Sequence, residues 1–258
     1  MKTEVIRRPS PEEEELAIKR DELERLERQL AEQELVLASL KAELAAFEGL
    51  YLRRVGVLYA ELDEWNARLA ELKAKKAETA ESKAQAAEAR AQAEDSHSAA
   101  HGATADIRPF TPSPELKKLY REAARRVHPD TAIDEPDRTR RERLMKEVNA
   151  AYAVGDEDAL RRILAGLDAS PDAVQGAGIG AELVRVLRQL KQVRDRIAAI
   201  RLEVANLAEA EIAKLKAKAE LAAIESRDLL SEMAASIQGR MNVAKQRYEM
   251  ELNGGEGK

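Results

Sequence analysis

Two long stretches of the chain space their large apolar residues alternately three and four apart. In the C-terminal stretch every step from Leu183 to Leu207 follows this rule, and the heptad register then fails at Glu211 and Lys214. Such heptad spacing places the apolar side chains on one stripe of an α-helix, which stays exposed to water unless a second helix covers it. Burying one leucine of the stripe is worth about 1.5–3 kcal/mol, against about 0.2–0.5 kcal/mol for a charge pair on the helix surface. Each stretch therefore needs a partner helix. The C-terminal stripe consists of Leu183, Val186, Leu190, Val193, Ile197, Ile200, Val204 and Leu207.

The N-terminal stretch has the same pattern with one change of phase. Its start is indicated by SPEE at Ser10, which offers a serine cap, a proline at the first helical position and a glutamate at the third. The apolar spacing then runs to Tyr51 and resumes at Val55, four residues later, where three were expected. This stutter locally relaxes a left-handed supercoil. Because Gly49 and Gly56 flank it, we expect a kink or a close helix–helix approach there; the alternative is one imperfect helix.

Composition agrees with an all-α fold and excludes several kinds of site. Charged residues make up 35% of the 258 residues and aromatic residues only 3%, which is typical of long helices and coiled coils. The absence of cysteine excludes disulfides, thiolate zinc sites and cysteine nucleophiles. His97 and His101 have a metal-compatible spacing but no third ligand nearby, so we expect no metal site and no cofactor. The sequence lacks a run of about 20 apolar residues and an apolar leader, which predicts a cytoplasmic protein without membrane contact.

The economical arrangement pairs the two arms with each other, antiparallel, and carries the middle of the chain at the tip. Pairing between two chains in a homodimer is the rival arrangement, and heptad spacing alone does not separate the two. From Lys73 to Asp95 the large apolar residues vanish, so we expect no tight partner there. The predicted parts are a disordered N-terminus at 1–9, an N-terminal coiled-coil arm at 10–95, a linker at 96–112, a small helical domain at 113–168, a linker at 169–180, a C-terminal coiled-coil arm at 181–252 and a disordered tail at 253–258.

The small helical domain is predicted to contain two antiparallel helices around a turn, closed by a third helix. Ser113 and Pro114 start the first helix and Pro129 ends it. A second helix is expected from Pro136-Asp137 to Gly155, and Asp156 then caps a short third helix. The predicted core includes Leu116, Leu119, Tyr120, Ala123, Ala124, Val127, Leu144, Val148, Ala151, Tyr152, Leu160, Ile163, Leu164 and Leu167.

This domain resembles the J-domain of DnaJ-type co-chaperones. The resemblance rests on LKKLYREAARRVHPD followed by LMKEVNAAYAVGD and covers about residues 114–156. In that family a basic second helix leads into a His-Pro-Asp turn. The family's first helix has no counterpart here, where IRPFTP offers only Ile107 and Phe110 to cover the same face, and the usual C-terminal motif is replaced by EDALRRIL. Neither a Gly/Phe-rich region nor a zinc-binding module is present. We refer to residues 113–168 as the J-like segment.

The resemblance implies a partner and a set of docking residues. J-domains bind a DnaK-type chaperone and stimulate its ATP hydrolysis, which makes His128, Pro129 and Asp130 the expected trigger. The basic residues before the turn are the candidate docking charges for an acidic chaperone surface, and the first helix of the segment nets +3 against Glu115 and Glu122. An ordinary solvated helix face is the alternative reading of that charge. The candidate docking charges are Lys117, Lys118, Arg121, Arg125 and Arg126.

Three functions are compatible with these features. The first is a co-chaperone or adaptor whose J-like tip recruits a DnaK-type chaperone while the coiled coil binds a client or scaffold protein. The second is an architectural coiled-coil adaptor whose J-like tip no longer couples to the ATPase. Nucleic-acid binding is the least favoured, because the net charge is −5 and aromatic residues are not interleaved with the basic ones. No nucleophile–base arrangement or phosphate-binding loop indicates an enzyme.

Overall fold

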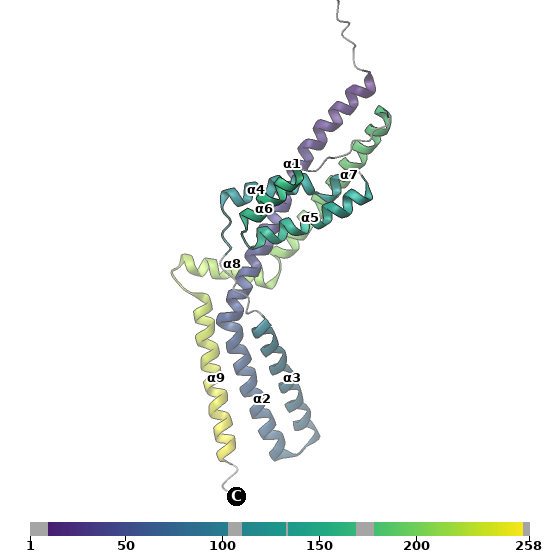
Figure 1. Cartoon of the computed structure of the whole chain (residues 1–258). Helices are drawn as coiled ribbons and strands as arrows, with labels where there is room; N and C mark the ends of the chain where they lie inside the picture. The colour runs from purple at the N-terminus through teal and green to yellow at the C-terminus, as the bar shows by residue number, and fades with distance from the viewer. Residues whose placement is uncertain (1–9, 103–109, 133, 169–177, 255–258) are drawn as a thin grey trace, which may run out of the picture. The chain divides into compact units, whose positions relative to one another are not determined.

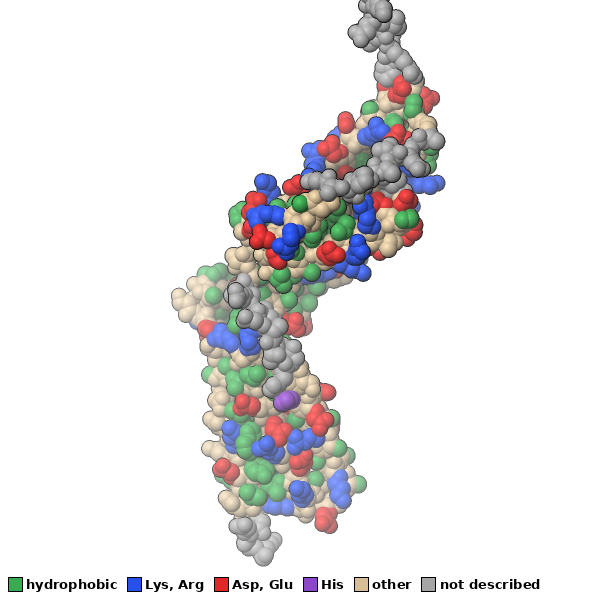
Figure 2. All heavy atoms as spheres, viewed as in Figure 1, with side chains coloured by type: hydrophobic (Ala, Val, Ile, Leu, Met, Phe, Trp, Pro, Cys, Tyr) green, Lys and Arg blue, Asp and Glu red, His purple; other side chains and the backbone are tan. Residues whose placement is uncertain are grey.

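The computed structural model describes residues 10–102, 110–132, 134–168 and 178–254, and within these ranges it is all-α, as predicted (Figure 1). The chain divides into two compact units. The first comprises Met1–Ala42 and Phe110–Glu209, and the second comprises Glu43–Pro109 and Ala210–Lys258. One long helix, α1 (Pro11–Tyr51), contributes to both units. Charged side chains of both signs are spread over the visible face (Figure 2).

The remaining helices follow the chain order of Figure 1. Besides the first part of α1, the first unit contains α4 (Pro114–Val127), a 3₁₀ turn (Pro129–Thr131), α5 (Glu135–Ala153), α6 (Glu157–Asp168) and α7 (Ile179–Ala208). Besides the end of α1, the second unit contains a π-helical turn (Leu52–Gly56), α2 (Val57–Ala77), α3 (Ala80–Gly102), α8 (Glu211–Ile224) and α9 (Leu229–Asn253).

The helix starts predicted from capping residues are confirmed. At Ser10 the backbone N–H donates to the Glu13 carboxylate at 2.7 Å, and the serine hydroxyl accepts from the Glu13 N–H at 3.2 Å, which completes the capping box. The Ser113 hydroxyl accepts from Leu116 N–H at 2.9 Å. The Asp156 carboxylate caps α6 in the same way, at 2.8 Å from the Ala159 N–H. These local signals need only neighbouring residues, and so the sequence alone suffices to locate them.

In the first unit α1 and α7 pair along their predicted apolar stripes, but the predicted antiparallel orientation is wrong. Arg20 forms an ion pair with Glu182, and Lys41 forms one with Glu203 at 2.6 Å. Because the partners advance together along both helices, α1 and α7 run parallel. Their shared apolar cluster contains Leu16, Leu23, Leu30, Leu37, Val186, Leu190, Val193, Ile197 and Ile200.

The second unit shows why the orientation differs from the prediction. The N-terminal arm is not one rod: it turns at Glu78, whose φ of 52° lies in the left-handed region, and α3 runs back along α2. Ser96 bonds Asp63 at 2.6 Å and Arg90 pairs with Glu71 at 2.8 Å, which fits an antiparallel α2–α3 pair. We had predicted that the chain reverses direction between the N-terminal and C-terminal arms. It instead reverses within the N-terminal arm, between α2 and α3.

The stretch without large apolar residues does hold a partner, contrary to the prediction. Buried alanines recur every seven residues on both helices: Ala60, Ala67 and Ala74 on α2, and Ala86, Ala93 and Ala100 on α3. A methyl side chain lets two helix backbones approach closely, so van der Waals contact replaces the area that leucines would bury. The helix also continues through Gly102, into the predicted linker at 96–112.

The stutter coincides with a π-helical turn inside a continuous helix, and the later loss of heptad register coincides with a helix end. A π-helical turn spans Leu52–Gly56 and buries Val55 completely, and such a turn accommodates one extra residue without leaving the helix. In the C-terminal arm, predicted as one helix over 181–252, α7 ends at Ala208, just before the position where the heptad register fails. A second break separates α8 from α9, which runs parallel to α2: Arg54 pairs with Asp228 at 2.6 Å and Lys76 with Glu251 at 3.1 Å.

Candidate functional site

The His-Pro-Asp turn follows α4 directly and is fixed by short-range hydrogen bonds. His128 leaves the helix with ψ of 127°, and Pro129 starts the 3₁₀ turn with the φ that its ring imposes. The backbone N–H of Asp130 donates to His128 Nδ1 at 3.2 Å. The Thr131 hydroxyl donates to the His128 carbonyl at 2.8 Å. The predicted trigger residues are thus brought together in one rigid turn.

The histidine of the predicted trigger is buried. His128 is only 2% exposed, and its Nε2 lies 3.1 Å from Oε1 of Glu34 on α1. Because Nδ1 accepts the Asp130 N–H, the proton of a neutral ring is on Nε2, which donates to the Glu34 carboxylate. In contrast, Pro129 and Asp130 are half-buried and reach the surface.

Glu34 connects the turn to α7 as well. Oε1 of Glu34 also accepts a hydrogen bond from Arg196 Nε at 2.8 Å and lies 2.7 Å from Arg196 Nη2 in an ion pair. Burial alone would raise the pKa of the Glu34 carboxyl, but the hydrogen bond from His128 and the charge of Arg196 outweigh it and hold this pKa below its usual value. Glu34 is therefore an anionic bridge between the turn and α7. We call the side chains of Glu34, His128 and Arg196 the Glu34 bridge.

The end of the turn is held by two further side chains. The Arg141 guanidinium on α5 donates to the Thr131 hydroxyl at 2.8 Å and to the Arg126 carbonyl at 3.1 Å. The Gln189 amide on α7 donates to the Thr131 carbonyl at 3.2 Å. The turn is consequently attached to α1, α5 and α7.

The candidate docking charges divide into two groups. Lys118, Arg125 and Arg126 are exposed, and Arg126 forms an i,i+4 ion pair with Glu122 at 2.8 Å. Lys117 and Arg121 are half-buried.

Acidic residues of α1 lie against the basic face of α4. Glu32 pairs with Arg121 at 2.8 Å. Burial raises the pKa of the Glu27 carboxyl, although the charges of Arg125 and Arg141 act in the opposite direction. Together with Glu34, these carboxylates place negative charge from the chain itself beside the predicted docking surface.

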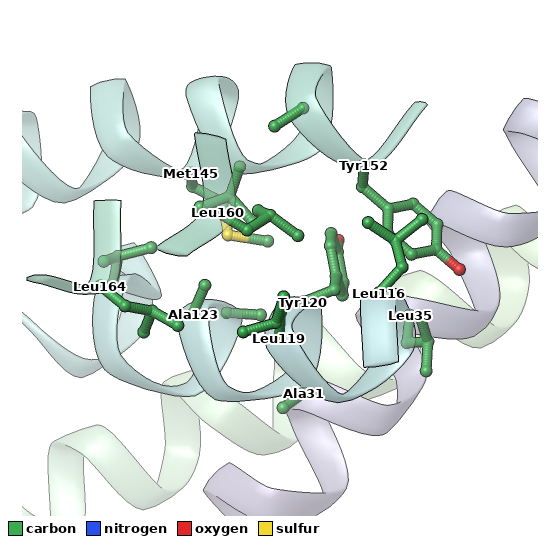
Figure 3. Close-up of a cluster of buried hydrophobic side chains, with 14 residues drawn as sticks. Ala31, Leu35, Leu116, Leu119, Tyr120, Ala123, Met145, Tyr152, Leu160 and Leu164 are labelled. Carbon is green, nitrogen blue, oxygen red and sulfur yellow. The ribbon is translucent and has the colours of Figure 1, made fainter. Parts of the chain in front are cut away.

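Most of the predicted core of the J-like segment is buried, and Met145 and residues of α1 add to it (Figure 3). Leu144, Ile163 and Leu167, which were predicted as core, are only partly buried. Tyr120, Val148 and Tyr152 are completely buried. Their cluster also contains Ala31 and Leu35 of α1, which point toward α4 in Figure 3.

One face of this core is closed by residues outside 114–156. Phe110 packs edge-on against Tyr152, with ring centroids 5.4 Å apart, and Ser39 on α1 shares a 2.7 Å hydrogen bond with the Tyr152 hydroxyl. Ile107, the other residue expected to cover this face, lies outside the described residues. Asn149 on α5 is exposed and accepts a hydrogen bond from the Tyr120 hydroxyl at 2.7 Å.

The sequence prediction missed Glu34, Arg196 and Gln189. A signal for two of them was present in the spacing. Glu34 follows Leu30 by four residues, and Arg196 follows Val193 by three, so each charge stands at a spacing otherwise used by buried apolar residues. Charged side chains at such positions are buried only when they are paired.

Comparisons with protein-family models, curated proteins and solved structures find no match for this chain. Among the helices in the described part of the chain, none is long and apolar enough to span a membrane. Within the same residues, no group of three or more His, Asp or Glu side chains is placed to hold a metal ion.

Proposed function

We propose that this protein is a J-like co-chaperone or adaptor that recruits a DnaK-type ATPase chaperone. The observation that carries the proposal is the rigid His-Pro-Asp turn at the end of α4, with exposed Lys118, Arg125 and Arg126 on the preceding helix. Cationic side chains on one helix steer an acidic partner and raise its association rate. A DnaK-type partner implies a cytoplasmic location. In this proposal the paired helices outside the J-like segment bind a client or scaffold protein.

A second candidate is an architectural adaptor whose J-like segment does not couple to an ATPase. The observation in its favour is the burial of His128 beneath α1 and α7 through the Glu34 bridge. A residue that is 2% exposed has almost no surface with which to touch a partner while this bridge is closed. The co-chaperone function therefore requires either that contact through Pro129 and Asp130 is sufficient or that the bridge opens.

The two candidates differ in single-turnover ATPase stimulation of a DnaK-type chaperone. Asp130→Asn is the most informative variant, because the Asp130 side chain is 20% exposed and the substitution keeps its shape. Asp158→Asn on α6, where the side chain is 79% exposed and outside the turn, is the matched control. A co-chaperone loses stimulation in Asp130→Asn and keeps it in the control. If the wild type does not stimulate the ATPase, or if all three proteins stimulate it equally, the co-chaperone function is ruled out and the architectural adaptor is favoured.

The Glu34 bridge supplies a second test of the same pair of candidates. Glu34→Gln keeps the size of the side chain but removes the charge that holds Arg196 and His128. If the buried turn limits docking, ATPase stimulation should increase in this variant, and Asp130→Asn in the same background should abolish the increase. An architectural adaptor shows no stimulation in either background.

A further inference from the structure

A groove of about 820 Å³ lies between α5 and α6, on residues that the proposed docking site does not use. Its floor is aliphatic and includes Leu144, Ala151, Ile163 and Leu167. Val154, at one end, is 80% exposed, which is unusual for a valine beside other apolar side chains. Figure 2 shows hydrophobic side chains over α5 and α6 with both basic and acidic side chains around them.

The charge at the rim of this groove is predominantly positive. Arg140, Arg143 and Arg162 line it, against a single acidic residue, Glu147. Arg140 is held by Asp137 at 2.9 Å. Arg143 and Arg162 make only long ion pairs of 3.9 Å, and their side chains are 74% and 72% exposed. Two guanidinium groups therefore flank an apolar floor. Each has five hydrogen-bond donors and is held, within the described part of the chain, only by a long ion pair.

We propose that the groove between α5 and α6 binds an acidic amphipathic helix of a partner protein. Two packed helices form a groove into which a third helix can place apolar side chains at i, i+3, i+4 and i+7. The twelve residues of α6 span about 18 Å, which is the length of about three turns of such a helix. Carboxylates on the flanks of the partner helix would reach the arginines on the two rims. A partner helix with a basic flank would meet like charge instead.

The proposal is tested with two synthetic helical peptides of about 14 residues. Both carry leucines at i, i+3, i+4 and i+7, and they differ only in having glutamate or lysine on the flanks. Binding to the full chain is followed by methyl NMR shifts of Val154 and Ile163 and by calorimetry, at two salt concentrations. We expect saturable binding of the acidic peptide, shifts at these two methyl groups, and weaker binding at high salt.

Neighbouring arginines on the same helices provide a matched control. Arg143 and Arg162 line the groove, whereas Arg138 and Arg161 do not. The double variant R143Q/R162Q should weaken binding of the acidic peptide about three- to tenfold, since exposed charge pairs each contribute a modest fraction of the affinity. The variant R138Q/R161Q, with the same change in net charge, should bind like the wild type.

Several outcomes would overturn the proposal. One is equal binding of the acidic and basic peptides, and another is equal loss of affinity in the two double variants, which would indicate a general charge effect. Shifts confined to other parts of the chain would place the peptide elsewhere. If neither peptide binds and the Val154 and Ile163 methyl signals instead depend on protein concentration, the groove is covered by a second copy of the chain.

Discussion

Removing the Glu34 carboxylate should destabilise the first unit more than removing any exposed carboxylate of α1. Glu34 is 4% exposed and accepts a charge-assisted hydrogen bond from Arg196, together with a hydrogen bond from His128. Truncating one partner of a buried pair costs about 3–5 kcal/mol when the other group stays buried. The Arg196 side chain is 35% exposed and can be hydrated, whereas the His128 side chain is 3% exposed and cannot. We therefore expect Glu34→Ala to lower the free energy of unfolding by about 2–3 kcal/mol.

Thermal unfolding by circular dichroism measures this effect. A loss of this size corresponds to a decrease in Tm of roughly 5–10 °C for a unit of this size. Glu32→Ala is the control, because Glu32 is on the same helix and its pair with Arg121 is about half exposed on both sides. An exposed pair contributes at most about 1 kcal/mol. If both variants lower Tm by the same amount, the Glu34 bridge is not the contact that holds the turn.

The pH dependence gives an independent check on the same carboxylate. The pKa of Glu34 is lower in the folded chain than in the unfolded chain, so the carboxylate contributes stability above its unfolded pKa. This contribution is lost as the pH falls through the folded pKa, below about 4.5. The Tm difference between the wild type and Glu34→Gln should therefore shrink between pH 7 and pH 3. A difference that is constant over this range would contradict the assignment of Glu34 as an anion.

The remaining predictions concern other parts of the chain. Glu27→Gln should raise Tm at pH 7 and not at pH 3.5, because the raised pKa of Glu27 favours the protonated form in the folded state. The stability that protonated Glu27 contributes is lost as the pH rises through the folded pKa. Equal Tm shifts at the two pH values would refute this. Ile200→Ala should lower the free energy of unfolding in urea by about 2–5 kcal/mol, because Ile200 is completely buried between α1 and α7. The control Leu202→Ala should change it by under about 0.5 kcal/mol, because Leu202 on the same helix is 64% exposed. Glu78→Gly should stabilise the turn between α2 and α3 by about 0.5–1 kcal/mol, because the φ of 52° at this position strains residues other than glycine. A lower Tm in this variant would mean that contacts of the glutamate side chain outweigh the backbone strain.

The parts of the fold set by local chemistry could be predicted from the sequence. The caps at Ser10, Ser113 and Asp156 need only a side-chain oxygen and an N–H three residues later. The core positions Tyr120 and Tyr152 follow from the helical period, which does not depend on what packs against them. The break after Ala208 coincides with the loss of heptad register for the same reason.

The direction of helix pairing could not be predicted, because heptad spacing is the same for parallel and antiparallel partners. It depends on how often the chain reverses, and one reversal, at Glu78, has no glycine to mark it. The packing of α3 against α2 was not predicted, for a related reason. Alanines such as Ala86 and Ala93 have high helix propensity everywhere, so their heptad spacing stands out only beside a facing helix with Ala67 and Ala74.

Two of the site residues that the sequence prediction missed, Glu34 and Arg196, have one physical origin, which is that the middle of α1 packs on two sides. Leu30 and Leu37 contact α7, whereas Ala31 and Leu35 contact the J-like core. Glu34 lies between these two stripes and is therefore enclosed by both neighbours. A carboxylate in that position is tolerated only if each neighbour supplies a donor, and Arg196 and His128 do so. The same contact that completes the core of the J-like segment therefore also buries its histidine, so stability and access to the turn are opposed at a single side chain.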